Sequence, residues 1–395
     1  MGIRVVVIDD NPHLAWQGGI YPANATFQRF VAALLDVPGS PVDSITSCVP
    51  VRPADSQPAS LPLDPRIRVV PTAPFDGIAG YLRHLPSLSR ANRPLLSRAI
   101  PAADLIWLKV PASNAALAAA IATRAGVPRF VWVAGSAAAV AAGRFDGPGG
   151  LAGRTIGTAY DAVGRLAALG GRRLVVGDGV VDGDGVVASL VEPWELRGPA
   201  ARTWPPADAA AIRLVWAGRL AGGKGLEALI EAVDVDPRLT LDILGDGPDR
   251  ARLHALAAAS GARDRITWAG HVSDRVAYLD RLAAADVFVF PSPAEGFPKV
   301  VLDAMAVGLP VVATGAGALD QLAAAGLVDE IERPDAVAIG AALGAFRARD
   351  GAAVRAQVQQ AHAFAAEHTR PAEAARLVAL WRRWWPDLPW ETLSA

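Results

Sequence analysis

The chain has little cysteine, with Cys48 as its only example among 395 residues. One thiol cannot form an intrachain disulfide, so the sequence excludes a disulfide framework. The opening residues MGIRVVVIDD lead directly into a strand pattern and lack the pattern of a signal peptide. We therefore expect a cytoplasmic protein.

Neither sign of charge is in excess, because 38 basic residues face 39 acidic ones. This balance argues against nucleic acid as a partner, so any anion site must be local and the expected substrate is a small molecule. Apolar runs of about 20 uninterrupted residues are also absent, which argues against a transmembrane segment. Peripheral contact with the cytoplasmic face of a membrane stays open, since apolar surface patches cannot be located from sequence.

Metal-ligand spacing is missing as well. No cysteine or acidic residue stands at ligand spacing from the histidines, which are His13, His84, His254, His271, His362 and His368. A Gly-x-Ser-x-Gly motif is also absent, so the sequence argues against zinc and serine-hydrolase chemistry. Asp182 and Asp184 flank Gly183 in a glycine-rich turn, where both are expected as turn residues. We predict no metal site.

The length and the pattern of the chain predict two α/β domains. Short β-rich runs alternate with alanine-rich helical runs in both halves, which is typical of doubly wound parallel sheets. We place the first domain at residues 1–191, a proline-rich linker at 192–211 and the second domain at 212–365. Residues 366–395 form a tryptophan-rich helical tail that is expected to pack on another part of the chain, with the first domain as the candidate.

Hydrophobic periodicity predicts the individual elements. In the first half, strands are expected at 3–8, 67–70, 105–110 and 130–133, with helices at 26–35 and 115–125. In the second half, strands are expected at 212–217, 239–244, 266–269, 287–290 and 310–314. Residues 38–65 are dense in Pro, Ser and Asp, so we predict an irregular surface connection there.

The most informative segment is PSPAEGFPKVVLDAMAVGLPVVATG, which begins at Pro291. Prolines interrupt the preceding apolar strand, and helical spacing resumes at Lys299. Glu295 is therefore expected on a loop at the carboxyl end of a strand, with Asp303 just over one turn into the following helix. The unpaired amides at the start of that helix would attract a phosphate.

A second segment, AGRLAGGKGLEALIEA, places Arg219 and Lys224 at either end of a glycine-containing turn. Arginine contacts phosphate through its planar fork and lysine acts as a point charge, so the pair could neutralise a diphosphate. Ordinary turn chemistry with solvated side chains is the alternative. Gly18 and Gly19 permit a similar close approach before a helix near Ala25, or they form a simple surface turn.

Three further features carry weaker expectations. The turn Gly245–Pro248, GDGP, is interpreted as structural. His13, on a loop after the first strand, suits an active-site role, with a solvated loop residue as the alternative. His271 follows a strand and could line a base pocket, with the same alternative.

Together these motifs resemble the retaining GT-B glycosyltransferases of family 4, the glycosyl transferases group 1. GRLAGGKG matches the phosphate loop of that family, GDGP matches as well, and EGFPKVVLD matches its two acids separated by seven residues. The resemblance covers about residues 212–321. It implies an α/β fold of two Rossmann-like doubly wound domains facing a central cleft. A nucleotide sugar on the second domain would react, without a metal, with an acceptor hydroxyl on the first.

The resemblance also assigns roles to residues. Arg219 and Lys224 would stabilise the diphosphate, Glu295 would contact hydroxyls of the donor sugar, and Asp303 would bind the ribose. The other residues of the implied donor site are Gly18, Gly19, Gly218, His271, Gly296, Phe297, Pro298, Lys299 and Val300. A UDP- or GDP-sugar is the implied co-substrate, and the departing diphosphate would accept the acceptor proton.

Two departures from the family pattern affect these roles. The second acid is normally glutamate, one methylene longer than Asp303, so the ribose contact is expected to be shifted or water-mediated. Many members carry a histidine after the fifth strand, where this chain has Gly135 and Ser136. Residues at strand ends are therefore the candidates for acceptor contact, namely His13, Lys109, Ser113 and Ser136.

Two other functions remain open from the sequence. A GT-B nucleotide-sugar epimerase shares the architecture, needs acid and base residues at the cleft, and would consume the donor alone. A catalytically silent nucleotide-sugar-binding protein is suggested by Asp303 and by the missing histidine. It would bind the donor without transferring the sugar.

Overall fold

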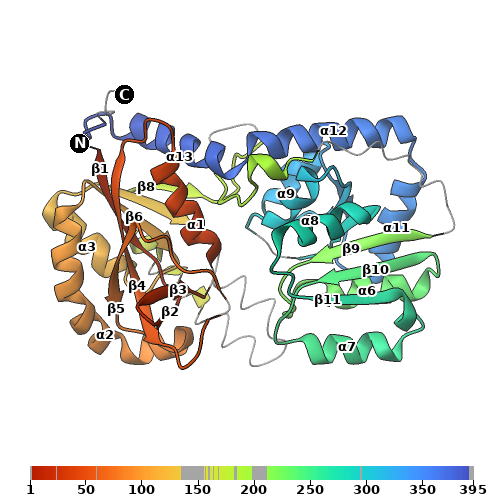
Figure 1. The fold of residues 1–395 in the computed structure, drawn as a ribbon, viewed down its shortest axis with the longest axis horizontal. Helices are drawn as coiled ribbons and strands as arrows, with labels where there is room; N and C mark the ends of the chain where they lie inside the picture. Colours follow the sequence, from red (N-terminus) through yellow and green to blue (C-terminus); the bar gives the residue numbers. More distant parts are fainter. Residues whose placement is uncertain are drawn as a thin grey trace. The chain divides into compact units, whose positions relative to one another are not determined.

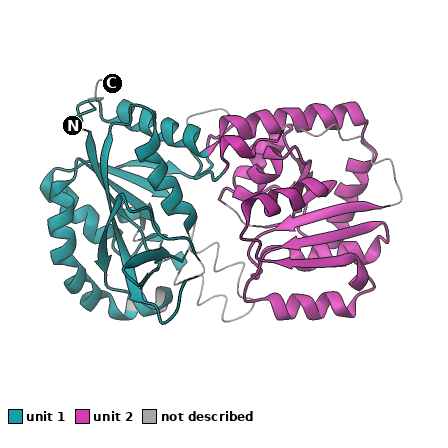
Figure 2. Ribbon diagram, in the orientation of Figure 1, with its two compact units in different colours: residues 1–178, 184–190, 370–395 teal, residues 179–183, 191–369 magenta. Residues whose placement is uncertain are grey.

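The computed structural model describes residues 2–23, 25–58, 60–134, 155, 157–158, 161–162, 164–167, 169–181, 185–197, 211–293 and 296–390. Its contacts divide the chain into two compact units (Figures 1 and 2). Unit 1 contains Met1–Asp178, Asp184–Leu190 and Arg370–Ala395, whereas unit 2 contains Gly179–Gly183 and Val191–Thr369. The long segment of unit 2 begins at Val191, where we place the end of the first domain. It ends at Thr369, close to residue 366, where we place the start of the tail.

Unit 1 is built on one sheet whose strands run parallel except for one hairpin. The strands are β1 (Ile3–Ile8), β2 (His13–Trp16), β3 (Gly19–Pro22), β4 (Val42–Pro53), β5 (Ile67–Thr72), β6 (Leu105–Val110), β7 (Arg129–Val133) and β8 (Arg172–Val175). Their order is β3-β2-β4-β1-β6-β7-β8, with β5 also paired to β4. Only β2 and β3 pair antiparallel among these described strands. β2, β3 and β4 were not predicted from the sequence.

Helices cover both faces of this sheet (Figure 1). The residues Ile3, Val5 and Val7 of β1 pack in one cluster with α1 (Ala25–Ala33) and α13 (Arg370–Trp384). Val6 and Ile8 pack on the other face with the end of α2 (Gly77–Ala99) and with α3 (Ala115–Ala125). Alternate side chains of a strand point to opposite faces, so a strand buried on both sides needs a run of apolar residues, which β1 has from Val5 to Ile8.

The irregular connection predicted for residues 38–65 is wrong for its first half, whereas the described residues after Pro53 have no regular element until β5. The first half contains β4, a strand of 12 residues that pairs with β1. The prolines misled the prediction because they do not interrupt that pairing: β1 pairs with β4 as far as Cys48, whereas Pro50 and Pro53 come later in the strand. Proline is tolerated where its missing N–H is not needed by the neighbouring strand.

The segment after β1 also differs from the prediction. We expected His13 on a loop, but it lies in β2, which pairs with β3 as a hairpin. Gly18 has a left-handed φ of 79° in the turn of this hairpin, and Gly19 begins β3. Gln17 and Gly18 therefore form the turn of the hairpin, Gly19 belongs to the strand that follows, and α1 begins only at Ala25.

Unit 2 contains a fully parallel sheet in the order β11-β10-β9-β12-β13-β14. Its strands are β9 (Ile212–Ala217), β10 (Leu239–Leu244), β11 (Ile266–Gly270), β12 (Val287–Phe290), β13 (Val311–Thr314) and β14 (Asp329–Ile331). The helices are α6 (Leu226–Val235), α7 (Arg250–Ala259), α8 (Arg275–Ala284), α9 (Lys299–Ala306), α10 (Ala318–Ala324), α11 (Ala336–Arg347) and α12 (Gly351–Glu367). The five strands expected here are confirmed, and β14 was missed.

Short 3-10 helices complete the described chain. They are η1 (Leu34–Asp36), η2 (Ile100–Ala102), η3 (Pro193–Glu195) and η4 (Arg263–Arg265). Within the described residues, no helix combines the length and the apolar character that a membrane crossing requires.

The last helix, α13, is part of the core of unit 1. Trp381 is fully buried, with its ring centroid 5.6 Å from that of Trp107 and 5.4 Å from that of Phe130. Glu373 of the same helix is also buried and accepts a hydrogen bond of 2.6 Å from the amide of Val187. The end of the chain thus closes one face of the first sheet.

This packing predicts a large effect of Trp381→Ala. Truncating a buried tryptophan leaves a cavity and should lower the free energy of unfolding by about 3–5 kcal/mol. Trp194→Ala is the control, because Trp194 is 58% exposed and its truncation should cost under about 0.5 kcal/mol. Denaturant titration of both variants measures the difference, and equal midpoints would contradict the packing role of α13.

Candidate functional site

The order of strands in unit 2 reverses at β9. Strands β10 and β11 follow on one side of β9, whereas β12, β13 and β14 lie on the other. β12 pairs directly with β9, with Val287 opposite Leu214. In open α/β sheets, ligands bind outside the carboxyl ends of the strands at such a reversal. The loops after β9 and β12 carry the two motifs that the sequence analysis singled out, so the topology brings them together.

These two loops approach each other closely. A Cβ atom built on Gly225 would lie 2.0 Å from the carbonyl oxygen of Pro291, so only glycine fits at this position. The hydroxyl of Ser292 donates to the carbonyl of Gly223 at 3.5 Å. Gly225 also has a left-handed φ of 69°, which glycine adopts without the steric cost of a side chain.

The second loop is fixed from its other side as well. The hydroxyl of Thr314, at the end of β13, donates to the carbonyl of Ser292 at 2.5 Å. The amide of Ala318, the first residue of α10, donates to the carbonyl of Gly296 at 3.1 Å. Neighbouring strands β9 and β13 therefore both anchor the loop that follows β12.

The GDGP turn supports the first loop, which agrees with its structural interpretation. Leu220 donates its amide to the carbonyl of Asp246 at 3.0 Å and accepts the amide of Asp249, also at 3.0 Å. A Cβ atom on Gly245 would lie 1.8 Å from the carbonyl oxygen of Gly218. The glycines of the turn thus let two backbone segments touch beside Arg219.

Positive electrostatic features gather on these loops. Arg219 is exposed and Lys224 is partly exposed, at the two ends of the loop after β9. Gly225 precedes α6, and Pro298 precedes α9. In this described part of the chain, neither residue makes a side-chain hydrogen bond to the first amides of its helix. The amides and the dipole of a helix amino terminus attract anions. The arrangement can therefore hold a phosphate-bearing ligand.

The expected site residues of the loop after β12 lie as follows. Glu295 is outside the described residues. Phe297 and Pro298 are buried, whereas Gly296, Lys299 and Val300 are partly exposed at the start of α9. His271 is exposed directly after β11. The loop after β11 touches the GDGP turn, because the amide of Gly245 donates to the carbonyl of Gly270 at 2.8 Å.

Asp303 lies in a buried ion network. Its side chain accepts a bond of 2.6 Å from Arg275 Nη2 and one of 3.3 Å from the hydroxyl of Tyr278. Arg275 also forms two bonds to Glu195, of 2.8 and 2.7 Å. Burial, followed by the charge of Asp303, raises the pKa of Tyr278 well above its usual value. Both oxygens of Asp303 are thus engaged by α8 within unit 2.

The roles of Glu195, Arg275 and Tyr278 in this network were not predicted from the sequence. Glu195 falls in the predicted linker, yet it is only 2% exposed and belongs to unit 2. Residues 198–210, which make up most of that linker, lie outside the described residues. A buried acid inside a proline-rich stretch gives no periodic signal, so only its partners reveal it.

Unit 1 has a similar reversal of strand order around β1, which lies between β4 and β6. Asp9 and Asp10 follow β1 directly. Lys109 Nζ lies 2.8 Å from Asp9 Oδ1. Ser113 donates its hydroxyl to Asp10 Oδ1 at 2.7 Å and its amide to Asp10 Oδ2. Lys109 and Ser113 therefore meet the two acids at the same edge of the sheet.

His13 lies at this edge but is fully buried. Its Nδ1 is 2.7 Å from the carbonyl oxygen of Asn11, and its Nε2 has no hydrogen-bond partner among the described residues. Burial lowers the pKa of His13, so the neutral ring is favoured near pH 7. Ser136, the fourth acceptor candidate, lies outside the described residues.

Asp9 and Asp10 of unit 1 were likewise not predicted as site residues from the sequence. The signal was present, because DD directly follows the apolar run of the first strand and parallel strands end in ligand sites. Within the described residues, no group of three or more His, Cys, Asp or Glu side chains is placed to hold a metal ion. Asp182, Gly183 and Asp184 lie outside that part of the chain.

Comparison with known families settles the relationship. Residues 211–344 match the family described as glycosyl transferases group 1. The match lies within unit 2. The lipopolysaccharide core biosynthesis glycosyltransferase LpsE of Rhizobium meliloti strain 1021 is 42% identical over 109 residues, which are 28% of this chain and 31% of LpsE. The chain thus matches only about a third of the length of such relatives.

Solved structures extend the likeness in fold to both units of the chain. Sucrose-phosphate synthase from Thermosynechococcus elongatus aligns with a TM-score of 0.70 and 18% identity, over 97% of this chain and 99% of that one. HepE from Anabaena, in complex with UDP-glucose, aligns with a TM-score of 0.60 and 16% identity, over 96% and 99%. The fold is GT-B, with two Rossmann-like units as expected.

The close approach of the two loops predicts the effect of Gly225→Ala. The new methyl group would clash with Pro291, which should cost about 1–3 kcal/mol beyond the strain of a left-handed alanine. Gly326→Ala is a matched control, since Gly326 has the same φ of 69° and a Cβ atom added there would meet nothing within 4 Å. A clearly lower thermal midpoint for the first variant is expected, and equal midpoints would refute the contact.

Proposed function

We propose that this protein transfers a sugar from a nucleoside diphosphate sugar to an acceptor hydroxyl. Unit 2 would bind the donor, and unit 1 would present the acceptor. One observation carries the proposal: the loop with Arg219 and Lys224 touches the loop that follows β12, at the strand reversal of a unit that belongs to a glycosyltransferase family. In this proposal, the donor-binding and acceptor-binding domains are the two compact units.

The charges on the loops suit a diphosphate leaving group. Negative charge grows on the diphosphate as the bond to the anomeric carbon breaks, so groups that already point there lower the barrier. Arg219, Lys224 and the first amides of α6 and α9 would supply this stabilisation. No step would need a metal ion, because the two side chains and the helix ends provide the positive charge.

The two acids would bind the sugar and the ribose. Glu295 would accept bonds from hydroxyls of the donor sugar, as the family resemblance implies. Asp303 would reach the ribose through a water molecule, since its carboxylate is shorter than glutamate and already holds Arg275 and Tyr278. Gly218, Gly296, Phe297, Pro298, Lys299, Val300 and His271 would complete the donor site, with Gly18 and Gly19 on the side of unit 1.

Retention of the anomeric configuration is part of the proposal. The departing diphosphate would accept the proton of the acceptor hydroxyl as that oxygen bonds to the anomeric carbon on the same face. Lys109, Ser113 and Ser136 would contact the acceptor, with His13 behind them. The donor would be a UDP- or GDP-sugar, and the complex of HepE with UDP-glucose supports a uridine nucleotide for this fold. The reaction would take place in the cytoplasm.

The cations predict the kinetic effect of Arg219→Ala and Lys224→Ala. Each variant should lose about 2 kcal/mol of transition-state stabilisation, or about 30-fold in kcat/KM, with an unchanged thermal midpoint. Arg263→Ala is the control, because Arg263 is an exposed arginine on η4. Release of UDP or GDP from UDP-glucose and GDP-mannose, with a panel of acceptors, measures the rate.

Wild-type kinetics in both variants would overturn the assignment of these cations. The same assay without an acceptor separates the competing functions. Rapid consumption of the donor alone would favour an epimerase, and tight donor binding without transfer to any acceptor would favour a silent binding protein.

The absence of a metal requirement gives a second prediction. Activity should persist in millimolar EDTA, because the charge of the diphosphate is met by side chains and helix amides. The measurement is the transfer rate before and after chelation, followed by addition of Mg²⁺. Complete loss that Mg²⁺ restores would contradict this part of the proposal.

A further inference from the structure

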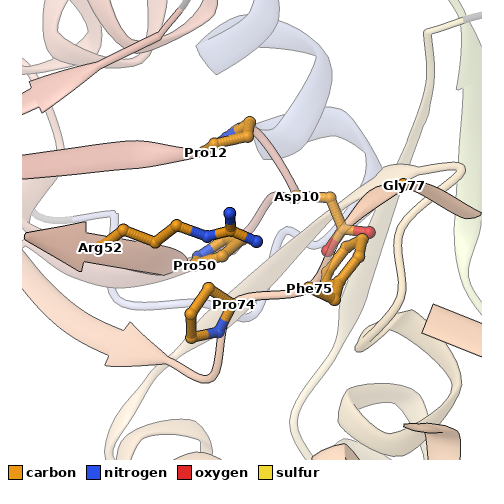
Figure 3. A pocket seen from close by; sticks show the side chains of 7 residues that line it. All are labelled: Asp10, Pro12, Pro50, Arg52, Pro74, Phe75 and Gly77. Atoms are coloured by element: carbon orange, nitrogen blue, oxygen red, sulfur yellow. The ribbon is translucent and has the colours of Figure 1, made fainter. Parts of the chain in front are cut away.

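A small pocket opens in unit 1 at the carboxyl ends of β1, β4 and β5 (Figure 3). It has a volume of about 230 Å³. Its walls include Asp10, Arg52, Phe75 and the three prolines Pro12, Pro50 and Pro74. Pockets for whole drug-sized ligands are about 300–1,000 Å³, so this one suits a single ring-sized group.

The walls of the pocket are apolar and stiff. Proline has a fixed φ and no amide hydrogen, so the three prolines present hydrocarbon surface rather than donors. The ring of Phe75 packs against that of Tyr81, with the ring centroids 5.5 Å apart. Apolar walls with a few placed polar groups are the usual composition of a small-molecule site.

Asp10 is one of these polar groups. Its carboxylate is oriented by the amide and the hydroxyl of Ser113, and the hydroxyl of Tyr81 donates to the carbonyl of Ser113 at 2.8 Å. Burial, followed by the charge of Asp10, raises the pKa of Tyr81 to about 12, so Tyr81 remains a donor at neutral pH. The bonds hold Asp10 as a fixed acceptor for hydroxyl groups.

Arg52 is the second polar group, and it is cationic. Figure 3 shows its side chain reaching into the pocket between Pro12 and Pro74, with Phe75 and Asp10 beyond its guanidinium. It forms an ion pair of 2.8 Å with Asp76, whose side chain is 89% exposed. Such an exposed pair is weak, so an anion inside the pocket can replace Asp76.

Arginine suits a particular class of anion. Its planar fork binds phosphate and carboxylate groups through two parallel hydrogen bonds. The helix α2 begins at Gly77, on the wall of the same pocket. Its first turn has no acidic side chain, and Asp76, which precedes it, makes no side-chain hydrogen bond to the first amides. The end of this helix adds to the positive potential beside Arg52.

We infer that the pocket holds a ring of the acceptor, and that this acceptor carries an anionic substituent, a phosphate or a carboxylate, besides its hydroxyls. Asp10 accepts hydrogen bonds from ring hydroxyls, Arg52 binds the anion, and Phe75 and the prolines cover the apolar faces of the ring. This inference rests on the proposed transferase function and adds the chemical class of the acceptor to it.

Binding of three hexoses to the full chain tests this. Glucose 6-phosphate, glucuronate and glucose differ in their anionic group, and calorimetry or ligand-observed NMR measures their affinities. We expect at least one anionic hexose to bind about 10-fold more tightly than glucose, and the tighter one identifies the anion as phosphate or carboxylate. Arg52→Gln should abolish the preference, whereas Asp76→Asn, which removes the competing carboxylate, should preserve or increase it.

Arg124→Gln is the matched control, since Arg124 is an exposed arginine on α3 of the same unit. It should leave all three affinities unchanged. Equal affinities for the three hexoses, including no binding of any, would overturn the inference, as would an unchanged preference in Arg52→Gln at an unchanged thermal midpoint.

A parallel titration with UDP and GDP separates this inference from the proposed function. These nucleotides would bind unit 2, so Arg52→Gln should not alter their affinities. Nucleotide binding without any preference for anionic hexoses would reject the acceptor class alone. If neither nucleotide binds the wild-type chain, the proposed function fails as well.

Discussion

The contact between Gly225 and Pro291 is the constraint on which the candidate donor site depends. Parallel pairing of β9 with β12 places the ends of these strands side by side, and the missing side chain of Gly225 lets their loops touch. Without that approach, the two loops would be held apart by at least one side chain. The GDGP turn and Thr314 fix the same two loops from their outer sides. Contacts of the backbone therefore fix the positions of the two loops, and Arg219 and Lys224 lie on one of these loops.

In both units a reversal of strand order brings charged groups together, and the groups differ between the two units. In unit 2, the reversal around β9 collects Arg219, Lys224 and two helix ends, which suits the negative charge of a diphosphate. In unit 1, the reversal around β1 collects Asp9 and Asp10, whose carboxylates accept bonds from Lys109 and Ser113. Carboxylates are acceptors for hydroxyl groups, which is the chemistry an acceptor substrate needs. The division of labour that we propose for the two units follows from the groups at each sheet edge, which are cations and helix ends in unit 2 and carboxylates beside Lys109 and Arg52 in unit 1.

Several features could be predicted because their signals are local. The strands of unit 2 are short apolar runs between breakers, and all five expected ones are present. The segment around β4 failed because proline density outweighed its apolar positions, although the prolines fall beyond the pairing with β1. The hairpin that contains His13 was not predicted because its strands, HLAW and GIYP, include His, Gly and Pro and so lack the apolar run that marks β12 and β13. Arg275, Glu195 and Asp303 come from three separate segments, so no window of sequence contains their network.

By itself, the sequence determined the α/β class, the two units, the phosphate-loop motif and the absence of a disulfide. These depend on residue types and on spacings within about 20 positions, where the period of a helix or strand is directly visible. The tertiary structure alone decided which face of the first sheet α13 covers, that Asp303 is engaged by Arg275 and Tyr278, and that Arg52 and Asp10 line one pocket. Such contacts join residues far apart in the chain, and their partners are selected by packing, which no local pattern encodes.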